Sequence, residues 1–305
     1  MPGTVVMGVI FVDIKGFPWG IYTPRGTNRG SVRYIHGGVA RNVAEDLLRI
    51  GAPVTFVTLS DRTPMGNDAL QRLSEQGADL SHAITVAQNG VGIWLAVMDE
   101  TGDLAGSISQ MPDTKPLEDY LALHGEAIVA EADHIAIEFD MGEEIAERIT
   151  DLAEQYGKDL YCIPGNMSVM LKRPDLLRRT RCVICNEVEA HKIFGRPLPQ
   201  EDPDGILEAV LQYGRGFGLR SMVVTLGASG AVYYDGPTGE SGFFPAQKVK
   251  MVDSTGAGDA FFSGVIAGLT RGLPLGRAVQ GGTRLAALTI QSEEACCPVI
   301  PDLWD

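Results

Sequence analysis

A glycine-rich segment near the C-terminal end of the chain carries the strongest chemical signal. It reads Asp-Ser-Thr-Gly-Ala-Gly-Asp over residues 253–259, where a strand-end loop is expected to become a helix. Gly256 and Gly258 would let the backbone approach a ligand, and successive N–H groups at a helix N-terminus would stabilise charge on a transferring phosphoryl group. Asp259 would then accept the proton of an attacking hydroxyl group. A simple tight turn is the alternative interpretation.

The composition limits the possible ligands. The 305 residues include 25 Lys and Arg against 39 Asp and Glu, a net charge of −14, and no basic run that could track a nucleic acid backbone. We therefore expect no nucleic acid partner, and the charge of a phosphorylated ligand must be met locally. The sequence has neither a Gly-Lys-Ser/Thr phosphate loop nor a Gly-x-Gly-x-x-Gly motif at a first strand.

Neither a secretory leader nor a membrane span is expected. The N-terminal residues lack a charged region followed by a long apolar stretch, and no later apolar run approaches membrane-spanning length. We therefore expect a cytoplasmic protein. The five cysteines include a single Cys-x-x-Cys pair at Cys182 and Cys185, which predicts buried thiols, with a redox or metal role as the alternative.

Alternating strands and helices are expected to position the glycine-rich segment. An apolar run over 5–12 ends at Asp13, which predicts a buried strand with a carboxylate at its C-terminal end, where α/β proteins bind ligands. The later alternation predicts an α/β fold with a doubly wound, mostly parallel sheet flanked by helices. Segments 14–35, as loop and short strands, and 91–109, as a hairpin, are expected to leave this sheet, and 1–305 to form a single domain.

Four sequence elements, in the same order, resemble the ribokinase family of carbohydrate kinases. Segment 253–259 is similar to the second signature of the family, and Gly-Gly-Val-Ala-Arg-Asn over 37–42 is similar to the first. Asn-Glu-Val-Glu over 186–189 resembles its Asn-x-x-Glu element, and Thr-Leu-Gly-Ala-Ser-Gly over 225–230 its nucleotide loop. The resemblance implies a ribokinase-like fold, an ATP-dependent kinase, and a lid formed by the two excursions.

The same resemblance assigns expected roles to individual residues. The catalytic base would be Asp259, and the anion hole would be formed by Gly256, Ala257 and Gly258. The expected substrate-binding residues are Asp13, Gly38, Arg41, Asn42 and Glu138. The expected nucleotide-binding residues are Asn186, Glu189, Thr225, Gly227, Gly230 and Thr283. Glu189 would act on Mg²⁺ through water, and a monovalent cation such as K⁺ is implied at Asp253, Thr255 and Ser292.

The substrate and the assembly follow from weaker features. Segments 37–42, 97–103 and 232–242 resemble the pseudouridine kinase branch, so pseudouridine is the expected substrate, with ribose or fructose as the alternative. Arg41 could contact a base carbonyl or pair with an acidic residue. A non-catalytic sugar- or nucleotide-binding module is the alternative from another class. A homodimer through the lid is also expected from the resemblance.

Overall fold

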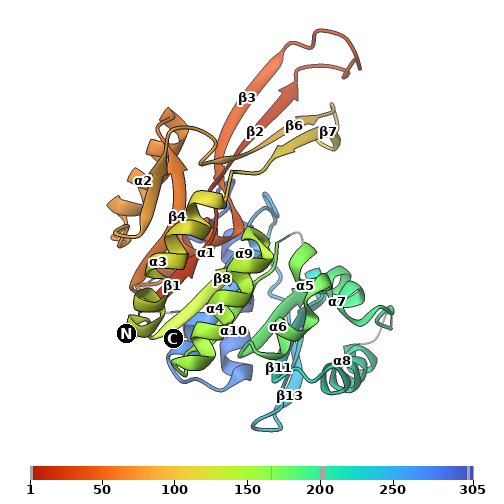
Figure 1. Cartoon of the computed structure of the whole chain (residues 1–305). Helices are drawn as coiled ribbons and strands as arrows, with labels where there is room; N and C mark the ends of the chain where they lie inside the picture. The colour runs from red at the N-terminus through yellow and green to blue at the C-terminus, as the bar shows by residue number, and fades with distance from the viewer. Residues whose placement is uncertain (1–2, 166, 200–202, 301–302, 305) are drawn as a thin grey trace.

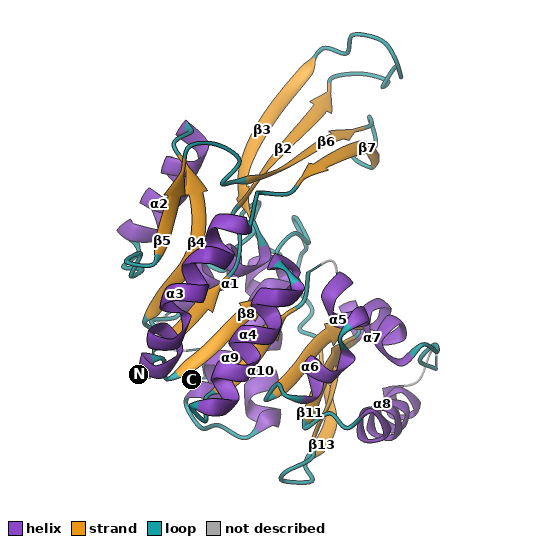
Figure 2. Cartoon of the chain, in the orientation of Figure 1, coloured by secondary structure: helices purple, strands orange, loops and turns teal. Residues whose placement is uncertain are grey.

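The computed structural model describes residues 3–165, 167–199, 203–300 and 303–304, and these form two sheets (Figures 1 and 2). Among them, the larger sheet has nine strands in the order β13-β12-β11-β10-β9-β8-β1-β4-β5. Strands β11 to β5 along this order are parallel, while β12 and β13 form an antiparallel edge. The strands are β1 (Thr4–Met7), β4 (Val54–Asp61), β5 (Ala83–Val86), β8 (His134–Glu138), β9 (Asp159–Ile163), β10 (Cys182–Asn186), β11 (Ser221–Thr225), β12 (Gly230–Asp235) and β13 (Ser241–Pro245).

Helices cover both faces of this sheet, as expected of a doubly wound fold. One apolar core includes residues of α1, α2, α9 and α10, and the other includes residues of α3 to α8. The helices are α1 (Val39–Arg49), α2 (Pro64–Glu75), α3 (Lys115–Glu131), α4 (Glu143–Gln155), α5 (Ser168–Lys172), α6 (Pro174–Arg178), α7 (Glu187–Phe194), α8 (Pro203–Phe217), α9 (Ala257–Thr270) and α10 (Leu275–Thr289), with short 3₁₀ turns η1 (Phe139–Met141) and η2 (Gly227–Ser229).

The second sheet is the lid, and it stands off from the larger sheet at the top of Figure 1. Its order is β3-β2-β6-β7, with bounds β2 (Phe11–Pro18), β3 (Gly30–Gly37), β6 (Gly92–Met98) and β7 (Leu104–Gln110). Two antiparallel hairpins, β2–β3 and β6–β7, join through the parallel pair β2–β6. The two expected excursions therefore form one sheet.

The prediction of one strand over 5–12 is wrong. Strand β1 ends at Met7, the chain crosses between the sheets at residues 8–10, and β2 begins in the lid at Phe11. A Cβ atom on Gly8 would lie 2.1 Å from the Cβ of Ala40, so the backbone passes close against α1 at this crossing. As a result, Asp13 lies on a lid strand and not at the end of a core strand.

Candidate active site

The glycine-rich segment forms the start of α9. Gly256 is the N-cap residue with a φ of 78°, and a Cβ atom there would lie 1.8 Å from the carbonyl oxygen of Ala295. Only glycine tolerates both this backbone conformation and this contact. Asp259 follows in the first helical turn, so one turn carries both this carboxylate and the free N–H groups of the helix.

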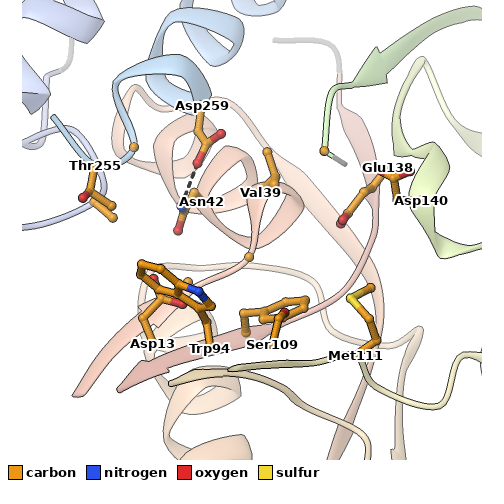
Figure 3. Close-up of a pocket in the computed structure, with 16 residues that line it drawn as sticks. Asp13, Val39, Asn42, Trp94, Ser109, Met111, Glu138, Asp140, Thr255 and Asp259 are labelled. Carbon is orange, nitrogen blue, oxygen red and sulfur yellow. Dashed lines mark hydrogen bonds between the residues drawn. The ribbon is translucent and has the colours of Figure 1, made fainter. Parts of the chain in front are cut away.

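A cavity of about 380 Å³ lies between this turn and the lid (Figure 3). Four expected substrate-binding residues, Asp13, Gly38, Asn42 and Glu138, line it together with Asp259, Gly256 and Thr255. Asn42 donates a hydrogen bond from its Nδ2 to Oδ2 of Asp259 over 2.7 Å. The structure therefore brings together side chains from the lid, α1, β8 and α9 around one space.

The lid contributes one face of its pleated strands to this cavity. Asp13 on β2 pairs with Trp94 on β6, which pairs with Ser109 on β7. Paired residues of neighbouring strands point to the same face, so these three side chains form a row toward the cavity. Met111 and Phe11 extend the lining with apolar surface.

A second cavity, of about 570 Å³, lies on the other side of the α9 turn. All four of the residues expected to contact the nucleotide from its loop and from α10 line it: Thr225, Gly227, Gly230 and Thr283. Ala257 and Gly258 form the wall nearest the first cavity. Apolar side chains from α9 and α10, including Phe261 and Ile290, complete a surface suited to a flat aromatic group.

A small cavity of about 100 Å³ has lining residues in common with each of the two. It shares Asp259 with the cavity under the lid, and it shares Thr225 and Gly258 with the larger one. Asn186 and Glu189 line it, and both also build the capping box of α7. The N–H of Glu189 donates to Asn186 Oδ1 over 2.9 Å, and the N–H of Asn186 donates to Glu189 Oε2 over 2.8 Å.

Burial dominates the electrostatics of the carboxylates. It raises the pKa of Asp259 to about 7, more strongly than the hydrogen bond from Asn42 lowers it. Burial likewise raises the pKa of Glu138 to about 7, and it raises the pKa of Asp13 against the opposing field of Lys15. A carboxylate with a pKa near neutrality can exchange a proton at physiological pH, which suits Asp259 to acid–base chemistry.

Arg41 is the expected substrate residue that the structure does not place in the cavity. Its side chain is only 2% exposed and lies behind Asn42, where it forms an ion pair with Glu45. The alternative interpretation, pairing with an acidic residue, is therefore correct for Arg41. Its Nη1 also donates to the backbone carbonyl oxygen of His36, on lid strand β3, over 3.4 Å.

The residues expected to bind a monovalent cation lie in two adjacent turns. In the first turn, the N–H of Thr255 donates to Asp253 Oδ1 over 2.8 Å. The backbone N–H of Val252 donates to the carbonyl oxygen of Ile290 over 2.7 Å and so joins the first turn to the second. Ser292 lies in the second turn, where its hydroxyl donates to the carbonyl oxygen of Thr289 over 3.3 Å. The cation role of these residues stays a prediction.

Several lining residues carry no recognisable sequence signal. Trp94, Ser109, Met111 and Asp140 all face the cavity under the lid. Lys15 is nearly buried beside it, with its Nζ 3.5 Å from Oγ1 of Thr255. They lie far apart in sequence: pairing of the lid strands brings Lys15, Trp94 and Ser109 together, while Asp140 comes from the turn η1 after β8.

Membrane-spanning helices and metal-binding side-chain clusters are both absent from the described part of the chain. Within it, no helix is both long and apolar enough to cross a membrane. No cluster of three or more His, Cys, Asp or Glu side chains within those residues could hold a metal ion. The cysteines of the expected Cys-x-x-Cys pair, Cys182 and Cys185, are free and buried thiols on β10.

Comparisons with known proteins agree with this geometry. Residues 1–302 match the family model described as pfkB family carbohydrate kinase. The chain is 34% identical to the guanosine-inosine kinase of Exiguobacterium acetylicum, over 98% of this chain and 97% of that protein. It is 25% identical to the pseudouridine kinase of Escherichia coli, over 95% of this chain and 90% of that protein.

The fold is shared with solved ribokinases. The Cryptococcus neoformans ribokinase in complex with ADP matches with a TM-score of 0.83 and 20% identity, over 98% of both chains. The Arabidopsis thaliana ribokinase complexed with ribose and ATP matches with a TM-score of 0.81 and 19% identity, over 99% of this chain and 96% of that one. The chain therefore belongs to the PfkB family of carbohydrate kinases, has the ribokinase-like fold, and is a kinase of a sugar or a nucleoside.

Proposed function

We propose that this kinase transfers the γ-phosphoryl group of ATP to the hydroxymethyl (5′-type) hydroxyl group of a nucleoside, with Asp259 as general base. One observation carries the proposal: Asp259 lines both the cavity under the lid and the small cavity, which in turn shares Thr225 and Gly258 with the larger one. A hydroxyl group bound under the lid would have its proton acceptor on the side from which the phosphoryl group arrives. This arrangement is what an in-line transfer requires.

The larger cavity is the proposed ATP site. Its wall at Ala257 and Gly258 belongs to the first turn of α9, where free N–H groups favour a phosphate. The same N–H groups, with that of Gly256, would stabilise the charge on the transferring group. The solved ribokinases bound to ADP and to ATP support this use of the fold.

Mg²⁺ fits the chemistry of the small cavity. Glu189 Oε2 accepts a backbone hydrogen bond in the capping box, so its other carboxylate oxygen is left for contact with a hydrated cation. Magnesium keeps several waters and needs few protein oxygens, and it would neutralise the phosphate oxygens. Binding of K⁺ at Asp253, Thr255 and Ser292 stays a prediction. If it is correct, turnover should be higher in K⁺ than in tetramethylammonium.

The lining of the lid favours a nucleoside over a free sugar. Trp94, Met111 and Phe11 give the lid side of the cavity an apolar surface, while the polar groups Asn42, Glu138 and Asp259 lie on the side opposite the lid. A sugar ring can occupy the polar side, and a planar base can stack on the indole of Trp94. The relative at 34% identity is named for guanosine and inosine, so purine ribonucleosides come first and pseudouridine second.

A coupled ATP-to-ADP assay would test this substrate class, with guanosine, inosine, pseudouridine, ribose and fructose as acceptors. Trp94→Ala should lower kcat/KM for the preferred nucleoside about 10- to 100-fold, the usual value of base stacking, and leave ribose turnover unchanged. Leu123→Ala is the control, because Leu123 is an exposed apolar residue of α3 that lies outside the lid and lines neither cavity. Turnover with ribose or fructose alone would refute a nucleoside as the substrate and would leave the kinase activity itself supported.

We also propose that the outer face of the lid pairs two subunits. Tyr34, Ile14, Leu95 and Ile108 are in register across the four lid strands, on the face opposite Asp13 and Trp94. Tyr34 is 61% exposed and Ile108 is 68% exposed, which is unusual for a row of large apolar side chains. Light scattering should give a dimer for the wild type and a monomer for Ile108→Glu, whereas a wild-type monomer would refute the pairing.

A further inference from the structure

Arg41 lies behind the active site and contacts the residue that touches the proposed base. Its Nη1 donates to Asn42 Oδ1 over 3.0 Å, and Asn42 Nδ2 donates to Asp259 Oδ2 over 2.7 Å. Arg41 is 2% exposed and Asn42 is 4% exposed, so water cannot easily replace either contact. We propose that Arg41 is a positioning residue, which fixes the side-chain amide of Asn42 so that its NH₂ group faces Asp259. The proposal rests on the role of Asp259 as general base.

The donor and acceptor properties of the three groups allow one arrangement. A guanidinium group can only donate, so the atom of Asn42 that faces Arg41 must be the carbonyl oxygen Oδ1. Its NH₂ group then points to Asp259, and an ionised carboxylate can only accept. Arg41 therefore selects the orientation of the amide that stabilises the ionised, proton-accepting form of Asp259.

Arg41 is itself held in place by a buried carboxylate. Glu45 lies one helical turn further along α1 and is fully buried, with its Oε2 paired to Nη2 of Arg41. Its Oε1 accepts from Arg49 over 2.5 Å, from Arg72 over 3.0 Å and from Gln76 over 2.8 Å. Burial raises the pKa of Glu45, but these donors together outweigh burial and lower it to about 2. Glu45 thus stays charged and anchors the guanidinium.

Without Arg41, the amide of Asn42 would be free to turn over. Oδ1 could then accept a hydrogen bond from a protonated Asp259, which would favour the inactive acid. The sulfur of Cys296 also lies near Oδ1, at 3.8 Å, but a thiol is a weak donor and cannot replace the guanidinium.

Arg41 and Asn42 also oppose the other groups that act on Asp259. Burial and the neighbouring carboxyl groups raise the pKa of Asp259, whereas Arg41 and Asn42 lower it. The carboxyl groups come from the lid, α1, β8 and α7, and they are Asp13, Asp46, Glu138 and Glu189. Loss of Arg41 should therefore make Asp259 harder to ionise.

The test compares Arg41→Met with Arg49→Met. Arg49 binds the same Glu45 carboxylate, and its other hydrogen bonds go to Glu294 and to the carbonyl oxygen of Cys297. Each variant would be assayed for kcat, for KM of ATP, and for kcat/KM of the nucleoside from pH 5.5 to about pH 9, the range in which a base of pKa near 7 titrates. Thermal unfolding would confirm that each is folded.

We expect Arg41→Met to lower kcat about 10- to 100-fold, the usual effect of losing a group that orients a catalytic contact, and to leave KM of ATP unchanged. Its acidic limb of kcat/KM should move to higher pH, and that of Arg49→Met should not. Equal losses in both variants with wild-type pH profiles would overturn the proposal, because Arg41 would then only neutralise Glu45. If Arg41→Met does not fold, Arg41→Lys should show a smaller shift in the same direction, and no shift would equally overturn it.

Asp259→Asn separates this proposal from the proposed function. If that variant keeps wild-type turnover, Asp259 is not the base and both proposals fail. If Asp259→Asn is inactive while Arg41→Met keeps the wild-type rate and pH profile, the base assignment stands and only the positioning role fails.

Discussion

Replacement of Asp259 by asparagine should separate the activity of this enzyme from its stability. The asparagine side chain keeps the size of Asp259 and can still accept from Asn42, but it cannot take the proton of a hydroxyl group. Turnover should fall by roughly 10²- to 10⁴-fold, the usual contribution of a positioned base. Binding of ATP should persist, because the larger cavity is lined by other residues.

The same substitution should stabilise the fold at alkaline pH. Burial raises the pKa of Asp259 from 3.8 to about 7, so the folded protein binds this proton more tightly than the unfolded chain does. Stability therefore falls as pH rises from 3.8 toward 7, and the cost is complete above pH 7. At about 1.36 kcal/mol per pH unit, the upper bound is on the order of 4 kcal/mol. Because the carboxylate borders an open cavity and keeps some water, we expect about 1–2 kcal/mol.

The assays are the coupled kinase reaction and urea unfolding at pH 5 and pH 8. The variant should be more stable than the wild type at pH 8, and the difference should shrink at pH 5, where the wild-type carboxyl group is protonated. The wild-type kcat/KM should rise with pH through an apparent pKa near 7. A variant that is inactive and also less stable at pH 8 would refute the argument, because the loss would then reflect damage to the fold.

Three further substitutions test other parts of the site. Asp13→Ala should raise the KM of the nucleoside about 10- to 100-fold and leave the KM of ATP unchanged, as expected for loss of a charged hydrogen-bond acceptor; equal effects on both would point to misfolding. Gly256→Ala should lower the free energy of unfolding by about 1–3 kcal/mol and abolish turnover, because the new Cβ atom would lie 1.8 Å from the carbonyl oxygen of Ala295. A variant as stable as the wild type would contradict this close contact. Glu138→Gln should stabilise the fold at pH 8 and not at pH 5, because burial raises the pKa of Glu138 to about 7; denaturation midpoints that do not depend on pH would disprove it.

The sheet and its helices could be predicted from the sequence, because each buried strand is a short apolar run followed by a turn. The strand over 5–12 could not be divided, since Met7, Val9 and Ile10 are all buried and no polar residue marks the crossing. Helix α3 gave no clear pattern either. Its apolar residues are not confined to one face, and Leu123 is 80% exposed.

In the site, the residues of one local motif could be predicted, and those brought in by strand pairing could not. Gly256, Gly258 and Asp259 could be predicted together because one turn of one helix positions all three. Trp94 and Ser109 could not, because Trp94 reaches the cavity by pairing with Asp13, about 80 residues away along the chain, and Ser109 by pairing with Trp94. Strand register is set by the whole lid, and no local motif encodes it.

The glycines of the first signature have a role that their sequence does not reveal. Gly38 has a φ of 97°, and a Cβ atom there would lie 2.6 Å from the carbonyl oxygen of Val9. The second crossing between lid and core, at 37–38, therefore packs backbone to backbone against the first, at 8–10. Asp13 follows the first crossing and Asn42 follows the second, so this contact fixes how far the substrate-side acid lies from the partner of the base. Glycine at 8 and at 38 allows these close contacts: a side chain at 38 would push the two crossings apart, and a side chain at 8 would meet Ala40 and Glu138.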